Sequence, residues 1–250
     1  MTRDRSARAL VTAVHAELAA TADPSKAPAM QRYMKSAMPY LGVPTPPLRR
    51  TCRDLFTRHP LEDFASWHDT VLALWRGATH REHRYAAIEL AGARRYAAMQ
   101  TLRALPMYEE MIVSGAWWDY VDALAHRLGD ILRRDGDRTK SRLRLWARSS
   151  NSWKRRAAIL SQLGFKRETD LTFLHDCIAP SMASDEFFLR KAIGWALRDL
   201  AWSDPATVVR YVKRWEATLS PLTRREALKN VPGGRRREAT GGRRFTVRPG

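Results

Sequence analysis

Apolar residues recur at helical spacing along most of the chain, and one stretch shows this most clearly. Its apolar positions follow the steps i, i+3, i+4, i+7 and i+11 of an amphipathic helix that faces a core: Trp117, Tyr120, Val121, Leu124 and Leu128. No segment shows the sustained alternation between hairpin turns that strands require. The pattern therefore predicts an all-α fold.

Thirteen helices are expected, with proline, glycine or capping residues in the breaks between them. Asp23-Pro24, Ser150-Asn151 and Asp204-Pro205 are typical breaks, and Pro44-Thr45-Pro46-Pro47 is expected to form a proline-rich loop. The expected helical ranges are 6–21, 25–37, 47–58, 61–75, 80–97, 100–114, 116–134, 138–149, 152–164, 168–182, 185–202, 205–218 and 222–230.

A period of about 35 residues runs through these helices. Five arginines occupy equivalent positions, with successive spacings of 35, 71, 35 and 35 residues: Arg49, Arg84, Arg155, Arg190 and Arg225. The spacing of 71 is a double step, whose missing member falls at 119 or 120. Two helices per unit of this length indicate an α-solenoid that forms a single domain over residues 1–231. No tetratricopeptide consensus is present.

The charge balance points to a polyanionic partner. The chain of 250 residues has 44 Lys and Arg against 26 Asp and Glu, a net charge of +18, while 44% apolar content excludes wholesale disorder. Nucleic acid is favoured over a small acidic metabolite, and an anionic membrane surface is a weaker alternative. If the recurrent arginines line a concave wall, the basic groove would follow a phosphate backbone. The alternative is that each arginine only caps or solubilises its helix.

Residues 232–250 are expected to form a basic, disordered tail, because they contain six arginines and little apolar content. Only Cys52 and Cys177 are present, without zinc-ligand spacing, and no apolar run reaches the length of a membrane span. Motifs for nucleotide hydrolysis, dinucleotide binding and zinc proteolysis are absent. We therefore expect a monomer without cofactor or metal, located in the cytoplasm and associated with the nucleoid when bound to DNA.

Trp118 and Asp122 lie one helical turn apart beside the apolar stripe, and Ala125 and Gly129 continue their row with small residues. A flat aromatic ring next to a carboxylate suits a site that holds a sugar or base and stabilises positive charge. Small neighbours would let a ligand approach closely. The alternative is a surface tryptophan and a solvated aspartate.

Two weaker constellations lie nearby. Asp119 and Asp122 could form an acid/base pair, but one of two such carboxylates is more often solvated. His80, Glu82 and His83 could suggest a metal cluster. Without a third ligand at helical spacing, they are expected to form a solvated, charged helix start.

Two further residues complete the candidate site. Arg156 follows the repeat arginine Arg155, and Trp195 lies off the core stripe of its helix. Around them the chain resembles the AlkD-type DNA alkylation repair glycosylases, from about Pro28 to Val231. The shared segments are Arg32-Tyr33-Met34-Lys35, Tyr40-Leu41-Gly42-Val43, Trp117 to Asp122, Trp153 to Leu160, Phe187 to Leu197, Leu219-Ser220-Pro221 and Arg225-Glu226-Ala227.

The resemblance implies HEAT-like repeats and the roles of individual residues. Asp122 would be the catalytic carboxylate, and Trp118 and Trp195 its flanking aromatic pair. Arg156 would anchor the DNA backbone, and Tyr33 would contact DNA near the lesion. The remaining basic positions expected to bind DNA are Arg84, Arg155, Arg190 and Lys191. The arginine-rich tail and the proline-rich segment at 44–47 depart from the family pattern.

The implied reaction is hydrolysis of the N-glycosidic bond of cationic N3- or N7-alkylated purines in duplex DNA, within base excision repair. Such a base is already a good leaving group, so the remaining task is to stabilise charge on the deoxyribose, which a carboxylate can do. The rival prediction is a noncatalytic α-solenoid that binds duplex nucleic acid or scaffolds protein partners. The net charge fits both, whereas Trp118, Asp122, Arg156 and Trp195 together favour the enzyme.

Overall fold

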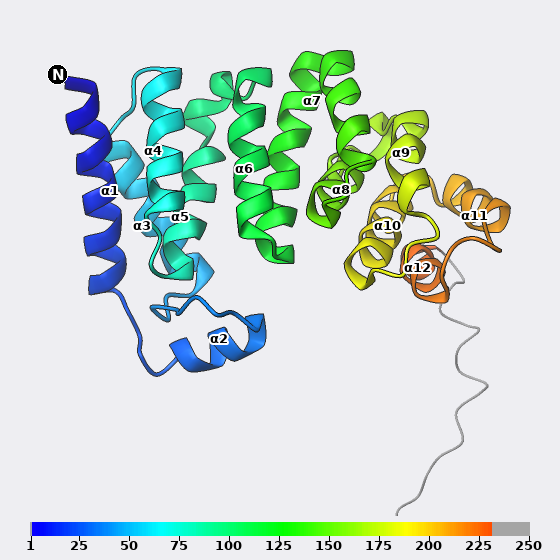
Figure 1. Ribbon diagram of the computed structural model, residues 1–250, viewed down its shortest axis with the longest axis horizontal. Helices are drawn as coiled ribbons and strands as arrows, with labels where there is room; N and C mark the ends of the chain where they lie inside the picture. Colours follow the sequence, from blue (N-terminus) through cyan, green and yellow to red (C-terminus); the bar gives the residue numbers. More distant parts are fainter. Residues whose placement is uncertain (1, 232–250) are drawn as a thin grey trace, which may run out of the picture. The chain divides into compact units, whose positions relative to one another are not determined.

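The computed structural model describes residues 2–231 and confirms the all-α prediction (Figure 1). Strands are absent from these residues. The α-helices are α1 (Thr2–Ala20), α2 (Ala27–Met34), α3 (Thr45–Arg58), α4 (Phe64–Arg76), α5 (Arg81–Ala91), α6 (Leu105–Gly115), α7 (Trp118–Ala147), α8 (Ser152–Leu160), α9 (Leu171–Ile178), α10 (Phe187–Leu200), α11 (Pro205–Arg214) and α12 (Pro221–Ala227). Short 3₁₀ helices span Arg94–Met99, Leu102–Ala104, Lys166–Glu168, Ala179–Ser181 and Leu228–Asn230. The expected tail at 232–250 lies outside the described residues.

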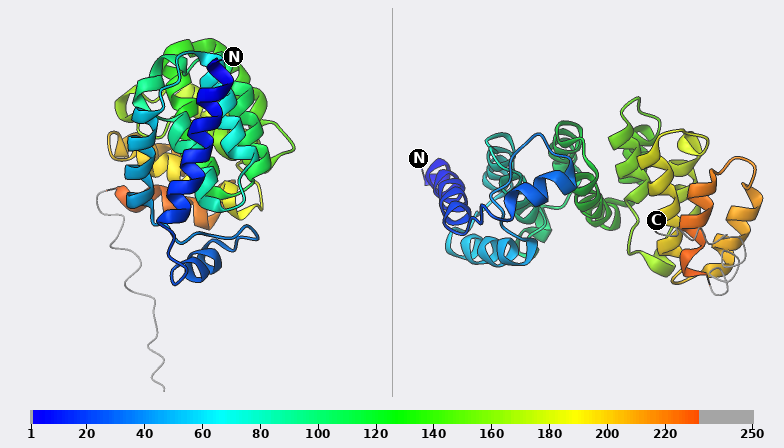
Figure 2. Two further views of the ribbon diagram at one scale, coloured as in Figure 1. Left: turned by 90° about the vertical axis from the view of Figure 1, so that its left-hand side faces the viewer. Right: turned by 90° about the horizontal axis from the view of Figure 1, so that it is seen from below.

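Two compact units make up the chain, Met1–Lys140 and Ser141–Gly250. In the first unit α1 packs on α3, α4 and α5, and α4 also packs on α5 and α6. The end-on view in Figure 2 shows α1 in front of the helices that it covers. In the second unit α10 packs against both α8 and α12, and α9 packs on α8. Each unit is thus built from successive packed helices, as in a helical-repeat protein, whereas the single domain over 1–231 stays a prediction.

Most expected helices are present. Two boundaries, the break near residue 136 and the start of α3, have a clear physical cause. The expected break between 116–134 and 138–149 occurs at Gly136, a non-helical residue inside α7 with φ of 38° and ψ of −115°. A residue with a Cβ rarely adopts this conformation, so glycine permits the kink. The expected loop at 44–47 is wrong, because Thr45 already begins α3 and its prolines occupy the first turn. Proline fits there, since the first amides of a helix need no intrahelical acceptor.

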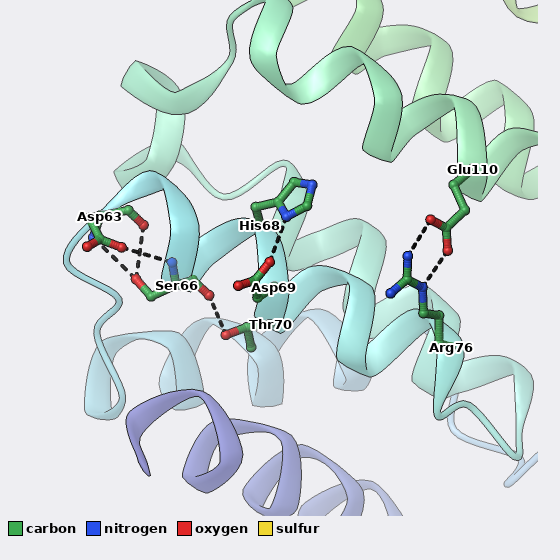
Figure 3. Close-up of polar contacts among 7 residues, drawn as sticks. All are labelled: Asp63, Ser66, His68, Asp69, Thr70, Arg76 and Glu110. Carbon is green, nitrogen blue, oxygen red and sulfur yellow. Dashed lines mark hydrogen bonds and ion pairs between the residues drawn. The ribbon is translucent and has the colours of Figure 1, made fainter. Parts of the chain in front are cut away.

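A capping box and an ion pair hold the two ends of α4 in place (Figure 3). The Asp63 carboxylate accepts a hydrogen bond from the Ser66 amide at 2.8 Å, and the Ser66 hydroxyl lies 3.3 Å from the Asp63 amide, which forms a capping box. At the other end Arg76 donates two hydrogen bonds of 2.6 Å to Glu110 on α6. Both members of this pair are well exposed, so the pair contributes little to stability.

The predicted apolar stripe lies in the core. Tyr120, Val121, Leu124 and Leu128 are fully buried, whereas Trp117 precedes α7 and is half-buried. None of the described helices combines the length and the apolar character needed to cross a bilayer.

Candidate functional site

A sharp reversal of the chain places Trp118 and Asp122 at the start of α7. Ala116 follows α6 in the left-handed conformation (φ 42°), and Trp118 begins the next helix. Trp118 is half-buried and Asp122 is only 7% exposed, so the alternative of a solvated aspartate is wrong. Ala125 and Gly129 are also buried. These small residues therefore face protein, and the row does not form the open track expected for a ligand.

Asp119, directly before the buried core residue Tyr120 of α7, holds a buried ion pair. Its two carboxylate oxygens accept hydrogen bonds of 2.7 and 2.6 Å from Nη2 of Arg81 on α5. The two side chains are 14% and 5% exposed. The hydroxyl of Tyr85 donates a third hydrogen bond to Asp119 at 2.7 Å. The expectation that one of the two aspartates is solvated is therefore wrong for Asp119 as well.

The Arg81–Asp119 pair is part of a larger network of hydrogen bonds and aromatic contacts. Because Tyr85 uses its proton on Asp119, the hydroxyl of Tyr40 donates to Tyr85 at 2.9 Å. The Arg81 guanidinium donates to Ser36 at 3.2 Å and lies 4.1 Å from the centre of the Tyr120 ring. Burial, followed by the negative charge of Asp119, raises the pKa of Tyr85 well above its usual range. The tyrosine therefore stays a donor and fixes the carboxylate.

Glu82 anchors the segment that carries Tyr40. Its carboxylate is fully buried and accepts hydrogen bonds from the amides of Leu41, Gly42 and Val43 at 3.0, 2.9 and 3.1 Å. Gly42 has φ of 85°, and a Cβ there would lie 2.0 Å from the carbonyl oxygen of Asp23. Only glycine can occupy this position without moving the backbone. The segment is thus held against α5.

The expected solvated helix start at 80–83 is wrong for Glu82 and also for His83. The His83 ring is buried and stacks on His15 with ring centres 3.9 Å apart. Burial, with additional repulsion from His15 and His80, lowers the pKa of His83 from 6.5 to about 4. Its Nδ1 accepts a hydrogen bond from the Thr79 amide at 3.3 Å, which requires the neutral ring. Among the described residues, no cluster of three or more possible ligands suits a metal ion.

The other expected site residues of the first unit differ in exposure. Tyr33 on α2 is 78% exposed, which leaves its ring available to a partner. Arg84 on α5 is half-buried, with its guanidinium 4.6 Å from the centre of the Trp75 ring. The Arg49 side chain is exposed and pairs with Glu89 at 2.8 Å.

In the second unit, Arg156 is a buried cross-link. It is 3% exposed, and its Nη1 donates to the carbonyl oxygen of Phe188 at 2.5 Å, which joins α8 to α10. The side chain of Asn151 caps α8 by accepting from the amides of residues 153 and 154. Trp195 on α10 is half-buried. Phe187, to which the sequence analysis assigned no role, exposes its ring at the start of the same helix.

The recurrent arginines of this unit and Lys191 lie on α8, α10 and α12, and most have acidic partners. Arg155 lies 4.0 Å from Glu186, and Arg190 pairs with Asp185. Lys191 lies 3.0 Å from Glu226. Arg225 is exposed and has no carboxylate within ion-pair distance among the described residues. These four cations therefore differ in how readily a phosphate could take the place of their partner.

Glu226 is the one buried acid in this group. Besides Lys191, it contacts Arg198 at 3.1 Å and Lys229 at 2.5 Å. Burial opposes its ionisation, but hydrogen bonds from Lys229 and Lys191 prevail and lower its pKa. Lys191 therefore compensates a buried charge within the protein, a role that its sequence position did not reveal.

These contacts share a signal that the sequence contains. Arg81 and Asp119 are 38 residues apart, and Tyr85 and Asp119 are 34 apart. Lys191 and Glu226 are 35 apart. Each pair joins adjacent repeats, so a search for opposite charges one repeat apart would have found the two ion pairs.

Trp118 and Asp122 lie in the first unit, whereas Arg156 and Trp195 lie in the second. Their assembly into one site stays a prediction, as do their individual roles.

Comparison with known proteins decides the family. A family model described as "DNA alkylation repair enzyme" matches residues 14–231. The chain belongs to this family. The match includes both units and every expected site residue. No curated protein sequence matches the chain significantly.

Solved structures of similar fold support the assignment. A predicted DNA alkylation repair enzyme from Enterococcus faecalis is 29% identical, with a TM-score of 0.75 over 83% of this chain and 95% of that one. AlkD2 from Streptococcus mutans is 18% identical, with a TM-score of 0.56 over 75% and 90% of the two chains. The smu.31 protein of Streptococcus mutans UA159 is also 18% identical, with a TM-score of 0.55 over 73% and 96%. The latter two show likeness of fold alone.

Proposed function

We propose that this member of the DNA alkylation repair enzyme family is a DNA glycosylase that releases cationic N3- and N7-alkylated purines from duplex DNA. The observation that carries the proposal is the buried carboxylate of Asp122, one turn from the half-buried ring of Trp118. A carboxylate beside an indole ring can stabilise positive charge that develops on a sugar. The net charge of +18 supports a polyanionic substrate.

The chemistry requires little beyond charge stabilisation. As the bond between C1′ and the purine nitrogen breaks, its electron pair neutralises the cationic base, and positive charge develops on the deoxyribose. A carboxylate near C1′ stabilises this charge and orients the water that attacks C1′. The water proton passes to the carboxylate or to solvent. Trp118 and Trp195 would hold the sugar, and an indole face stabilises a cation by about 0.5–2 kcal/mol.

The test is single-turnover release of N7-methylguanine from duplex DNA, with a binding titration on the same duplex. Asp122→Asn keeps the shape and removes the charge, so we expect base release to slow by ~10²–10³ while affinity holds or improves. Asp69→Asn is the matched control, because it removes an exposed carboxylate in the same unit. Thermal unfolding of each variant confirms the fold.

Equal base release by the wild type and Asp122→Asn would refute the role of Asp122. A wild type that binds the duplex but releases no base would instead support the noncatalytic solenoid.

A further inference from the structure

The second unit contains a pocket whose lining includes none of the cations expected to bind DNA. The pocket, of about 600 Å³, opens between α9 and α11. Leu197 and Leu200 of α10 also line the pocket, whereas Arg190 and Lys191 of the same helix and Arg225 of α12 do not. The proposed glycosylase reaction assigns no role to the residues that line the pocket.

The inner part of the pocket is apolar. Leu174 of α9 and both Leu197 and Leu200 of α10 line it and are buried, and Leu171, which also lines it, is 45% exposed. The transfer of an apolar side chain from water into such a pocket lowers the free energy of the complex. The ligand is therefore expected to contribute an apolar group.

Two arginines line the same pocket from α11. Arg210 and Arg214 are both exposed and lie one turn apart. Arg210 donates to the hydroxyl of Thr207 at 2.6 Å, and the Arg214 guanidinium lies 5.4 Å from the centre of the Trp215 ring. Neither has a carboxylate within ion-pair distance among residues 2–231, unlike Arg155, Arg190 and Lys191. Two guanidinium groups without a carboxylate in direct contact, beside an apolar pocket, favour a ligand that carries carboxylates.

The aromatic wall of the pocket is already occupied by its own contacts. His175 stacks on Trp215 with ring centres 5.3 Å apart and an interplanar angle of 22°. Its Nδ1 also shares a hydrogen bond of 3.0 Å with the hydroxyl of Tyr211. Because these rings use their faces and polar atoms on each other, the wall suits an aliphatic or aromatic side chain better than a nucleobase between two rings.

We propose that this pocket binds an acidic peptide segment of a partner protein. An apolar side chain of the segment lies over Leu174, Leu197 and Leu200. Neighbouring carboxylates form charge-assisted hydrogen bonds with Arg210 and Arg214. The site recruits a protein to this unit through residues other than the cations expected to bind DNA on α8 and α10.

The test uses a short fluorescein-labelled peptide in which aspartates flank one phenylalanine, measured by fluorescence anisotropy on the full chain at about 0.15 M salt. Replacement of the phenylalanine by alanine in the peptide should weaken binding about tenfold, because the buried ring is lost. Arg214→Gln should weaken binding of the original peptide about tenfold. Lys213→Gln removes the same charge from an exposed neighbour that does not line the pocket, and should leave affinity nearly unchanged.

Several results would overturn the proposal. No binding by the wild type, or equal affinity for the phenylalanine and alanine peptides, would exclude an apolar anchor in the pocket. Equal losses of peptide affinity in Arg214→Gln and Lys213→Gln would show that the peptide is attracted only by the overall positive charge of the chain. A single-stranded oligonucleotide that displaces the peptide, and loses affinity in Arg214→Gln alone, would assign the pocket to nucleic acid. Release of N7-methylguanine by Arg214→Gln at the wild-type rate would confirm that the pocket acts separately from the proposed glycosylase site.

Discussion

The Arg81–Asp119 pair of the first unit and the Arg155 and Arg190 pairs of the second unit differ in burial. In the first, Arg81 and Asp119 are almost completely buried, and each has further hydrogen-bond partners. In the second, Arg155 and Arg190 pair with Glu186 and Asp185, whose side chains are largely exposed. A buried pair fixes geometry, because neither charge can move into water without loss. An exposed pair is weak, so a phosphate can replace the carboxylate at little cost.

This contrast indicates that the buried network maintains the structure, whereas the exposed cations are available to bind DNA. The network of Ser36, Tyr40, Arg81, Tyr85 and Asp119 holds the start of α7, on which Trp118 and Asp122 lie. Arg155 of α8 and Arg190 of α10, which pair with exposed acids, remain exchangeable. We therefore expect changes in the network to affect stability, and changes in exposed cations to affect DNA affinity.

The largest expected effect comes from Asp119→Asn. This change leaves the buried guanidinium of Arg81 without its counter-charge, and the expected loss is about 3–5 kcal/mol in the free energy of unfolding, measured by urea titration. Glu110→Gln is the control, because it breaks the exposed pair with Arg76 and should cost no more than about 1 kcal/mol. The double variant Arg81→Met/Asp119→Leu should recover part of the loss. Equal costs for Asp119→Asn and Glu110→Gln would contradict the contrast between buried and exposed pairs.

The helices could be predicted from the sequence because their signals are local. The stripe through Tyr120, Val121 and Leu124 and the break near Gly136 depend on residues within a few turns of each other. Proline was less informative, since at 44–47 it marks the start of α3 and not a loop.

Burial of polar residues could not be predicted in the same way. Asp119 and Glu82 have the local sequence of solvated residues, and their partners lie 34 to 41 residues away. The candidate site was therefore predicted as a set of residue types, while the contacts that hold Asp119 beside it were missed. The repeat period was available as a guide to those contacts, because Arg81 and Asp119 are separated by 38 residues.

A smaller effect is expected from His83, a buried group in the first unit that pairs with no carboxylate among residues 2–231. Its pKa is lowered from 6.5 to about 4 in the folded state, so the unfolded state binds more protons between these pH values. The free energy of unfolding should therefore fall as pH decreases from 6.5 to about 4, by up to about 3 kcal/mol. Urea titrations across this range would measure the slope.

In His83→Gln the slope should be shallower, whereas His126→Gln, at an exposed position of α7, should keep the wild-type slope. An unchanged slope in His83→Gln would assign the acid sensitivity to other groups.

The smallest expected effect distinguishes two cations of the second unit that the sequence treated alike. Arg225 is exposed without a carboxylate partner among the described residues, whereas Lys191 contacts the buried carboxylate of Glu226 at 3.0 Å. If Arg225 contacts phosphate, Arg225→Ala should reduce the magnitude of the slope of log affinity against log salt by roughly one. Lys191→Ala should change that slope less, and should instead destabilise the unit, because Glu226 keeps only Arg198 and Lys229 as counter-charges. Salt titrations on one duplex, together with urea unfolding of both variants, would measure the two effects. A full unit of slope lost in Lys191→Ala, without loss of stability, would mean that DNA competes successfully with Glu226 for the lysine and that burial of the acid does not reserve its partner.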